Sequence, residues 1–544
     1  MRASATAVIL SGAPVPQTSF ELALKTTLVP EKAVNGTPTF TRNSIAILAD
    51  FEAILKTAKS GEIRFEGARR VENALNSVAN TSSEDLTTAG WNKTPASVTK
   101  NILSIVSGSG TAQHKIYASC SILAGAIINF RVRVKGMTGR YAGIAVVGSA
   151  SSIIGVSLDT TTGSITQTLA ANGGTLSDYG VSSAQDADGW LVVVKGTLNA
   201  GDVTIYSQLS VGNSSSYKPN DAYSSSALEI GFTKILVSQE PGSNTNFPEY
   251  VSNGVLSAPY HGANANGVKY YDYLNGNTIS AHVVAEATGA AINEQTLKGA
   301  LIEGGRTNYY LQSGAPATQT IALGAGTYTI TVSGTGSITL SGGASGTVTS
   351  AASLTFTTTG STTFTLTGSL TTVQVEYGAF ASSYIATAGA AVTRAADVLA
   401  YPSANINNQE GGVYLEFIPQ HIPSGTISLF GSYVDANNYS QIFNDTQNMV
   451  FRNRINGTNY DTINANVFAS RTLYKTANSW GKRLNLAING SRGGACQVIS
   501  PIQLSASLQI CANGNNTQQG FLNMKNIRFY QKSIPESKLA KLTI

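Results

Sequence analysis

The sequence has few of the side chains that carry most catalysis and most electrostatic binding. Only 12% of its 544 residues are charged, against roughly 25% in an ordinary globular domain, and only four residues are histidines. The net charge of +5 is too dilute for a nucleic-acid channel, which needs clustered Lys and Arg. We therefore expect a binding or scaffolding protein that has no nucleic-acid partner, no cofactor and no metal site.

Cysteines and long apolar runs are also scarce. Three cysteines cannot form a disulfide framework, and buried free thiols are the simplest interpretation, although Cys496 and Cys511 could pair if their strands are neighbours; the third is Cys120. The apolar run near the N-terminus, Ala7 to Leu10, is too short for a signal peptide or a membrane span. These features predict a chain made in a reducing compartment, without membrane insertion.

Hydrophobic residues alternate with polar ones at a period of two. Tyr328, Ile330 and Val332 fall on one face of a predicted strand, with threonines on the other face. Further along the pattern repeats, and it is typical of antiparallel strands with one face buried. Phe130 and Val132, which alternate with basic residues, follow the same rule. The predicted fold class is all-β, with tandem antiparallel β-sandwiches of the jelly-roll type.

Turn and helix signals support this fold class. Asn-Gly dipeptides favour type I′ hairpin turns and occur at residues 172–173, 253–254, 266–267, 456–457, 489–490 and 513–514. Short helices are expected only in the N-terminal region, at Phe51 to Lys59, and at the C-terminus, at Pro535 to Leu542. The second has Ser533 as a possible cap, and Glu536 in its first turn suits the helix dipole.

Residues Thr307 to Val375 contain no charged residue and no histidine. A Gly/Ser/Thr-rich linker would explain this composition, but a linker has no reason to keep a two-residue alternation of aromatic and β-branched side chains. A small sandwich with a threonine-rich outer face is the better interpretation. Because uncharged sheet edges invite association, we expect neighbouring copies of the chain to cover them.

An internal repeat organises the chain. An opening motif at Glu66 to Ser77 is echoed at Glu303 to Ser313, and each copy introduces a β-rich module. The modules close with related segments, Gln239 to Tyr250 and Val375 to Thr387. We expect Arg and Glu of each opening motif to form an ion pair at the start of its sandwich. The predicted domains are residues 1–80, 81–250, 251–313, 314–400 and 401–544.

The opening motifs carry a resemblance to a known family. The segment Glu66 to Ser77, followed by Ser83 to Leu86 and Trp91, resembles a motif of tailed-bacteriophage fibre and spike proteins. Gly267 to Tyr271 and Ser383 to Ile385 are similar to the same family. In that family such motifs precede jelly rolls that are like carbohydrate-binding modules. Residues 411–530 resemble a concanavalin A-like sandwich of the laminin-G type.

The resemblance implies a structural virion protein, made in the host cytoplasm and carried on the tail or the capsid of the particle. It implies a homo-oligomer, most simply a trimer, that binds a host-surface polysaccharide or another receptor. The first thirty or so residues match nothing nameable, and in such proteins this end usually attaches to another virion protein. Tail and capsid attachment are not separable from the sequence, and neither the receptor nor the host is defined by it.

Catalytic motifs are absent from the sequence, so we expect no enzyme. Asp186 to Gly189 begins like a calcium loop but lacks the acids that complete one, and a plain turn is expected. The tryptophans are expected in the core. A depolymerising tailspike would need paired carboxylates across a cleft, for which spacing in sequence nominates only weak pairs such as Asp435 with Asp445. A bacterial surface adhesin is the third hypothesis.

A stretch rich in Tyr, Asn and Arg in the C-terminal sandwich is the candidate glycan-binding site. Aromatic rings stack on sugar faces, and amide and guanidinium groups orient a polar ligand through hydrogen bonds. An ordinary polar outer face of a sheet explains the same pattern and stays open. The candidate residues are Tyr433, Tyr439, Arg452, Asn456, Asn459 and Tyr460.

Overall fold

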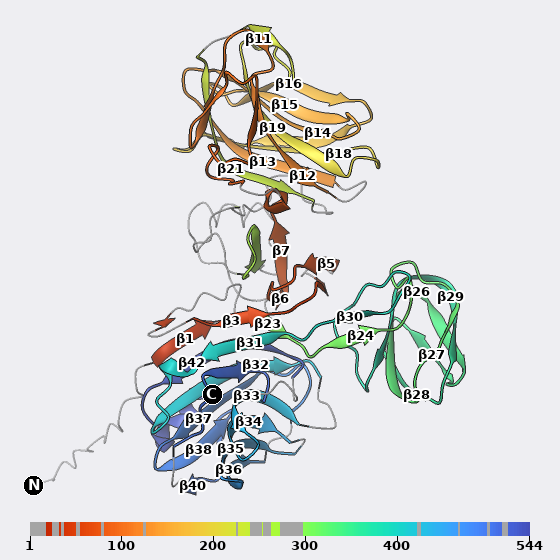
Figure 1. Cartoon of the computed structure of the whole chain (residues 1–544), viewed down its shortest axis with the longest axis vertical. Coiled ribbons are helices and arrows are strands. Elements are labelled where there is room, and N and C mark those ends of the chain that lie inside the picture. The colour runs from red at the N-terminus through yellow and green to blue at the C-terminus, as the bar shows by residue number, and fades with distance from the viewer. Residues whose placement is uncertain are drawn as a thin grey trace, which may run out of the picture. The chain divides into compact units, whose positions relative to one another are not determined.

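In the computed structural model nearly all of the regular secondary structure is β-strand (Figure 1). It describes residues 18–23, 32–33, 37–49, 55–77, 81–122, 127–224, 227–239, 253, 263–272, 298–421, 426–445, 447–465, 468–497, 501–513 and 520–544. The chain divides into two compact units: an inserted unit, residues 68–296, and a flanking unit formed by residues 1–67 together with residues 297–544. The predicted all-β fold class is confirmed.

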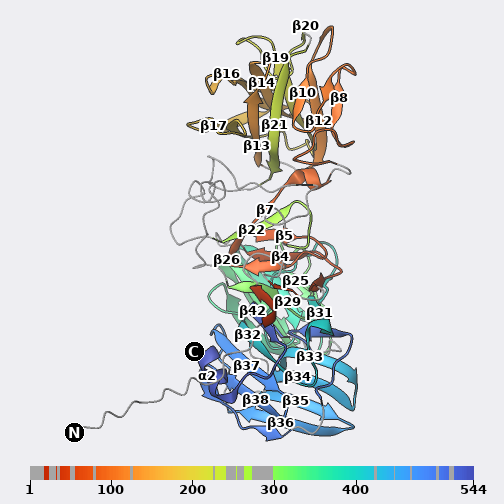
Figure 2. The same cartoon turned by 90° about the vertical axis from the view of Figure 1, so that its left-hand side faces the viewer.

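The inserted unit is a sandwich of two six-stranded antiparallel sheets, most of whose strands are labelled in Figure 2. The strand orders are β17-β18-β13-β21-β10-β9 and β16-β15-β14-β19-β12-β8. The bounds are β8 Asn92–Thr94, β9 Thr99–Lys100, β10 Ser104–Val106, β12 Lys115–Ser121, β13 Ile127–Gly136, β14 Tyr141–Gly148, β15 Ile153–Asp159, β16 Ser164–Ala171, β17 Thr175–Val181, β18 Trp190–Thr197, β19 Thr204–Gly212 and β21 Glu229–Ser238. Two short pairs accompany them, β11 (Thr111–Ala112) with β20 (Tyr223–Ser224) and β7 (Ala68–Glu72) with β22 (Val268–Asp272).

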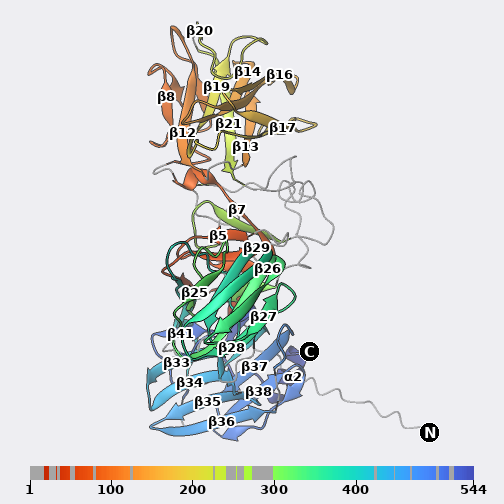
Figure 3. The same cartoon turned by 90° about the vertical axis from the view of Figure 1, so that its right-hand side faces the viewer.

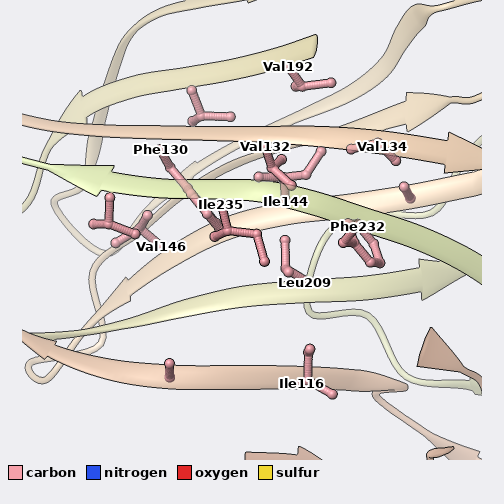
Figure 4. Packing of buried hydrophobic residues seen from close by; sticks show 14 of the residues in the cluster. Ile116, Phe130, Val132, Val134, Ile144, Val146, Val192, Leu209, Phe232 and Ile235 are labelled. Carbon is pink, nitrogen blue, oxygen red and sulfur yellow. The ribbon is translucent and has the colours of Figure 1, made fainter. Parts of the chain in front are cut away.

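The core of the inserted unit lies between its two sheets. Phe130 and Val132 of β13 face Ile144 of β14 and Leu209 of β19 in one cluster of buried side chains (Figure 4). The predicted alternation on β13 is therefore confirmed. Arg131 and Arg133, which alternate with these residues, are also buried. Arg133 donates a hydrogen bond to the carbonyl of Gly189 (3.1 Å), because the turn before β18 reaches its guanidinium.

The charge-free segment folds as the expected small sandwich (Figure 3). Two long strands, β26 (Gly326–Gly342) and β29 (Thr362–Tyr377), pair over most of their length. Phe356 of β28 (Leu354–Thr358) contacts Phe364 of β29 across the core, with ring centroids 6.1 Å apart. The other strands are β24 Arg306–Asn308, β25 Gln319–Ile321, β27 Gly346–Thr349 and β30 Val392–Arg394. Gly336, which lies opposite Gly368 in the pair of β26 and β29, has a φ of 138°. A Cβ there would lie 2.1 Å from the Thr367 carbonyl oxygen, so the close approach requires glycine.

The C-terminal sandwich recruits strands from the N-terminal segment. One sheet has the order β3-β31-β41-β33-β34-β35-β36, and the other has β2-β1-β42-β32-β37-β38-β39 with β6, β23 and β40 attached. Phe430 on β33 contacts Phe529 on β42, which places the core between the sheets. The bounds are β1 Thr18–Ala23, β2 Lys32–Ala33, β3 Thr39–Thr41, β6 Arg64–Glu66, β23 Gly299–Ile302, β31 Val398–Pro402, β32 Gly411–Pro419, β33 Ile427–Asp435, β34 Asn438–Asn444, β35 Met449–Ile455, β36 Thr458–Asn464, β37 Tyr474–Trp480, β38 Arg483–Ile488, β39 Ser491–Arg492, β40 Cys496–Gln497, β41 Ser507–Ile510 and β42 Leu522–Tyr530.

The two opening motifs fasten their modules through the same side-chain device. Asn73 donates its amide N–H to the carbonyl of Ile235 (2.8 Å) and accepts the N–H of Val237 (3.2 Å). Asn308 donates its amide N–H to the carbonyl of Val373 (3.5 Å) and accepts the N–H of Val375 (3.0 Å). Each asparagine oxygen also accepts the N–H two residues further along the chain. The repeat seen in the sequence is therefore a repeat of hydrogen bonding, although the first closing segment from residue 240 lies outside the described residues.

An ion pair within the opening motif forms in the first copy, as predicted. For the second copy the prediction is wrong. In the first copy Arg70 bonds Glu72 at 2.7 Å. In the second copy Glu303 bonds Arg64 from the N-terminal segment at 2.7 Å, whereas Arg306 of the same motif lies over the ring of Phe380 at 4.1 Å. Pairing in space with a strand far away in sequence decides this, since β23 lies beside β6.

Glu303 belongs to a buried network of five charged side chains, each 2% exposed or less. Arg64 also bonds Asp397 at 2.6 Å, and Asp397 bonds Arg42 at 3.0 Å. Arg394 lies 3.6 Å from Glu303. The network joins β6, the residues around β3 and the ends of the small sandwich. Because charges this deep must be paired, we expect these segments to fold together.

We expect acid to weaken the flanking unit through Glu303. Burial alone raises the pKa of Glu303, but Arg394, Arg64 and hydrogen bonds from Ser383 outweigh burial and lower it to about 2. A carboxyl whose pKa is lower in the folded chain stabilises it above its ordinary value of 4.5, and this contribution disappears as pH falls toward 2. The difference in melting temperature between the native chain and Glu303→Gln should shrink over that range; a difference independent of pH would contradict the assignment.

The N-terminal helix prediction is wrong. Leu55–Ala58 forms strand β5, which pairs with β4 (Ala46–Ala49), and residues 51–54 lie outside the described residues. Lys56 and Ala58 are buried while Leu55 is exposed, so the true period is two. The C-terminal helix is confirmed as α2, Glu536–Leu542. Two 3-10 turns, η1 (Ala74–Ser77) and η2 (Ser403–Asn405), are also present.

Ser533 does not cap α2. The helix begins after Pro535 without any side-chain cap, and the Ser533 hydroxyl donates instead to the carbonyl of Trp480. Glu536 occupies the first turn and Lys541 the last, as the helix dipole favours. Within the described residues, no helix has the length and apolar character needed to cross a membrane.

Of the six Asn-Gly turns named in the sequence analysis, three have both residues at positive φ, as type I′ turns require: residues 172–173, 456–457 and 489–490. At residues 266–267 only the glycine has positive φ, so the prediction is wrong there. The glycines of the remaining two dipeptides lie outside the described residues. Among the described residues, Cys120, Cys496 and Cys511 form no disulfide bond. Cys120, in the core of the inserted unit, and Cys511 are buried as expected, whereas Cys496 is half-buried.

Candidate glycan-binding site

The strands β33 to β36 bring several candidate residues into one row. Tyr433 lies opposite Tyr439, Tyr439 lies opposite Arg454, and Arg454 lies opposite Asn459. Directly opposite residues on antiparallel neighbours share a face of the sheet. We call Tyr433, Tyr439, Arg454 and Asn459 the outer ladder.

Contacts within the outer ladder follow from this register. The rings of Tyr433 and Tyr439 are nearly parallel, at 21°, with centroids 6.3 Å apart. The Arg454 guanidinium carbon lies 5.9 Å from the centre of the Tyr439 ring, and its Nη1 donates to Asn459 Oδ1 at 3.3 Å. Sequence reasoning missed Arg454, although a strand alternation counted from Arg452 would have found it.

Arg452 lies on the same face in the neighbouring row, but its charge is already paired. Nε and Nη2 donate to the two carboxylate oxygens of Asp461, at 2.8 and 2.6 Å. The bond to Asp461 raises the pKa of Arg452, and the guanidinium carbon lies 5.1 Å from the centre of the Phe443 ring. Arg452 therefore supports the sheet face and has little freedom to bind an anion.

The structure separates two further candidates from the outer ladder. Asn456 is exposed in the turn between β35 and β36, where its N–H donates to Asn438 Oδ1 at 3.0 Å. Tyr460 alternates with Asn459 and Asp461 along β36, so its side chain leaves the opposite face of the sheet. A one-residue step on a strand reverses the face, and only the register with β35 shows which residues are partners.

The outer ladder leaves specific groups available to a ligand. Tyr433 and Tyr439 are half-buried, and the Asn459 amide is exposed. Arg454 Nε is shielded from solvent and donates to no atom among the described residues. Ring faces and edges and an exposed amide are groups that bind a neutral, hydroxyl-rich molecule, whereas the shielded Arg454 Nε is not accessible to one.

The tryptophans pack in the cores, as predicted. Trp91 and Trp480 are fully buried, and Trp190 packs half-buried against the core of the inserted unit. Each indole N–H donates to a main-chain carbonyl, at 2.8, 2.9 and 2.7 Å for Trp91, Trp190 and Trp480. The rings of Trp91 and Trp480 are therefore not accessible to a sugar.

Acidic residues serve turns and ion pairs. Asp186 and Gly189 bridge a tight turn before β18, as expected, and Lys234 bonds Asp188 at 2.8 Å. Asp435 and Asp445 each accept the N–H groups of their own turns. Among the described residues, no three His, Cys, Asp or Glu side chains cluster as a metal site would require.

A cavity of about 620 Å³ lies within the flanking unit, beside β4 and β5. Phe380 and His421 stack in its wall, with centroids 4.1 Å apart, and Phe521 lies 5.9 Å from Phe380. Burial and the charge of Arg306 lower the pKa of His421. These rings come from segments far apart in the sequence, so no local sequence signal indicated the cavity.

The fold defines a class, all-β chains built from tandem antiparallel sandwiches. No protein-family model matches the sequence, and no curated protein matches it. Among solved structures, the chain is similar to the CBM40 module of the Ruminococcus gnavus IT-sialidase bound to α2,3-sialyllactose. The identity is 10% and the TM-score 0.23, over 25% of this chain and 82% of that one.

Two other solved structures show a similarity of the same order. Domain 4 of AbnA, a GH43 extracellular arabinanase of Geobacillus stearothermophilus in complex with arabinotriose, has 16% identity and a TM-score of 0.24 over 27% of this chain and 73% of that one. The binding domain of botulinum neurotoxin serotype D has 10% identity and a TM-score of 0.23 over 27% and 39%. At these TM-scores the similarities carry no conclusion about what this chain binds.

Proposed function

We propose that the chain is a structural virion protein, a fibre or spike of a tailed bacteriophage, that binds a host-surface glycan or another receptor without catalysis. The outer ladder of the C-terminal sandwich is the observation that carries the binding part of this proposal. The virion part is supported by the resemblance of both opening motifs to the fibre family. The matching bonds of Asn73 and Asn308 support the duplicated architecture.

The geometry of the outer ladder suits a glycan. Four side chains from four neighbouring strands stand in one row, and β-strands hold them with little freedom to move. A site that is already ordered loses little entropy when a ligand binds. The rings of Tyr433 and Tyr439 offer apolar surface to the C–H face of a sugar, and the exposed amide of Asn459 offers hydrogen bonds to its hydroxyls.

Replacing Tyr433 and Tyr439 together by alanine should weaken binding of the purified chain to host cells by roughly tenfold. Each ring contributes about 0.5–1.5 kcal/mol beyond its buried area, and 1.4 kcal/mol corresponds to a factor of ten. Tyr460→Ala is the matched control, because it removes a tyrosine from the same sheet on the other face. Equal binding by the double variant and the native chain would exclude the outer ladder as the receptor site.

The assembly is part of the proposal. A homotrimer would cover the uncharged, threonine-rich edges of the small sandwich, and the N-terminal region would attach the fibre to another virion protein. Imaging of intact particles with a label on the chain tests attachment and separates tail from capsid positions. Recovery of the chain from cell envelopes instead of particles would favour the adhesin hypothesis.

The depolymerase hypothesis predicts that the chain shortens a polysaccharide, whereas the binding proposal predicts that it does not. Purified chain incubated with host capsular polysaccharide should leave its chain length unchanged if the protein only binds. Shortening of the polysaccharide would overturn the non-catalytic proposal. The register of β33 with β34 puts Asp435 and Asp445 at opposite ends of that hairpin, so they do not form the pair considered from the sequence, and substitution of Asp435, the acid next to the outer ladder, would then show whether it takes part.

A further inference from the structure

Lys115 in the inserted unit is a nearly buried cation for which the described residues hold no anionic partner. Its side chain leaves the outer face of the β8–β16 sheet, since its neighbour Ile116 points into the core, and it is 9% exposed. Nζ donates to Gln208 Oε1 at 3.1 Å and to Asn220 Oδ1 at 2.7 Å. An ammonium group has three N–H donors, so one donor has no acceptor among the described residues.

This arrangement is unfavourable without a ligand. Burial of an ammonium group far from a carboxylate costs free energy, and here burial lowers the pKa of Lys115 to about 8. The described ion pairs of the inserted unit lie elsewhere, at Glu72, Asp159, Asp186 and Asp188. A carboxylate brought by a ligand would supply the missing charge.

A strap, residues 212–221, crosses the outer face at Lys115. The row opposite Lys115 runs through Ser210 and Gly143 to Ser157. Tyr217 of the strap donates its hydroxyl hydrogen to Ser210 Oγ at 2.8 Å, and Asn220 accepts from Lys115. Ser157 Oγ is buried in this row and has no partner in the described part of the chain, which is a second unsatisfied polar group on the same face.

The next row of the same face offers a ring and an amide. Across the sheet this row contains Tyr117, Gln208, Ala145 and Gly155, each lying opposite the next on the neighbouring strand. Tyr117 is half-buried and its ring meets that of Tyr206 edge to face, with centroids 5.9 Å apart. Ala145 and Gly155 add no long side chain to this row, which ends at Leu169 opposite Gly155; Gln208 itself is 6% exposed.

We propose that this outer face binds a sugar residue that bears a carboxylate. The carboxylate accepts the unused N–H of Lys115, the sugar ring packs against Tyr117, and the Gln208 amide N–H groups donate to ring hydroxyls. An acidic peptide fits less well, because β19 and β14 are hydrogen-bonded on both edges and present no free backbone to an added strand. The site lies in a different unit from the outer ladder and does not depend on it.

The test uses the full chain and three acidic polysaccharides: polygalacturonate, hyaluronate and polysialic acid. Each is compared by titration calorimetry with its carboxyl-reduced form, in which the charge is replaced by an alcohol on the same backbone. We expect at least one acidic polymer to bind, and its reduced form to bind about 10- to 100-fold more weakly, as loss of a charged hydrogen bond implies. This comparison needs no variant of the protein.

Variants locate the site. Lys115→Met should reduce binding of the acidic polymer by the same factor, and Tyr117→Ala should also reduce it. Lys135→Met, which removes an exposed lysine on the other sheet that donates to the Ala187 carbonyl, should bind normally. The Tyr433/Tyr439 double variant should also bind normally, so a failure of this site is distinguishable from a failure of the outer ladder.

Four results would overturn the inference: no binding of any acidic polymer, equal binding of the reduced forms, native binding by Lys115→Met, or stronger binding of poly-glutamate than of every polysaccharide. The last result would reassign the face to an acidic protein. Equal melting temperatures of Lys115→Met and the native chain confirm that a loss of binding is not a loss of fold.

Discussion

Asp397→Ala should destabilise the flanking unit by about 3–5 kcal/mol, the range for breaking a buried ion pair and leaving its partner unpaired. The Asp397 carboxylate bonds Arg64 at 2.6 Å and Arg42 at 3.0 Å, and it also accepts the N–H of Glu303 at 3.1 Å. Without Asp397, the network keeps a single carboxylate, that of Glu303. Three buried guanidinium groups remain, those of Arg42, Arg64 and Arg394.

Hydrogen exchange followed peptide by peptide in urea is the suitable measurement, because two units that unfold separately have no single free energy of unfolding. Peptides of residues 297–544 should lose protection at lower urea, while those of the inserted unit should not change. Asp188→Ala is the matched control: it breaks an exposed pair with Lys234, for which less than about 1 kcal/mol is expected. Equal effects of the two substitutions would show that burial does not strengthen the network.

Trp480→Ala should have an effect of similar size, about 3–5 kcal/mol, because it empties a large volume in the core of the C-terminal sandwich. Trp480 is 1% exposed, its ring meets Phe451 of the opposite sheet edge to face at 6.3 Å, and its Nε1 donates to the Asn407 carbonyl at 2.7 Å. The indole also fills the space beside Gly411, where an added Cβ would lie 2.6 Å from it.

The same exchange measurement in urea reports this loss, and Trp480→Phe should recover part of it by refilling the volume without the hydrogen bond. Binding to host cells gives the discriminating control. A Trp480→Ala chain that kept its stability and lost binding would mean that this ring meets a ligand, and the packing assignment would be wrong.

Strand periodicity is the part of the fold that the sequence predicts well. Tyr328, Ile330 and Val332 alternate with threonine over a segment without charge, and they form the core of the small sandwich. Alternation of apolar and polar residues predicts strands well because the backbone alone sets the two-residue period of side chains along a strand. The same principle corrects the helix expected at Phe51 to Lys59, where Lys56 and Ala58 are buried as alternate residues of β5.

The candidate site was predictable only in part. The sequence placed Tyr433, Tyr439 and Asn459 in one region, but the register with neighbouring strands added Arg454 and removed Tyr460. The face that a residue takes depends on pairing, and a bulge shifts the pairing between Tyr433 and Asp435. Lys115 has no sequence signal, because its lack of a counter-charge depends on a strap more than a hundred residues away.

The sequence by itself determined that this chain is built of strands, that its opening motif occurs twice, and that its middle segment buries a core without using charge. Each of these is a local property, written in neighbouring residues. The tertiary structure alone decided that Glu303 pairs with Arg64, which side chains share the outer ladder, and that Lys115 lies under a strap. Those depend on contacts between residues distant along the chain, which no local pattern encodes.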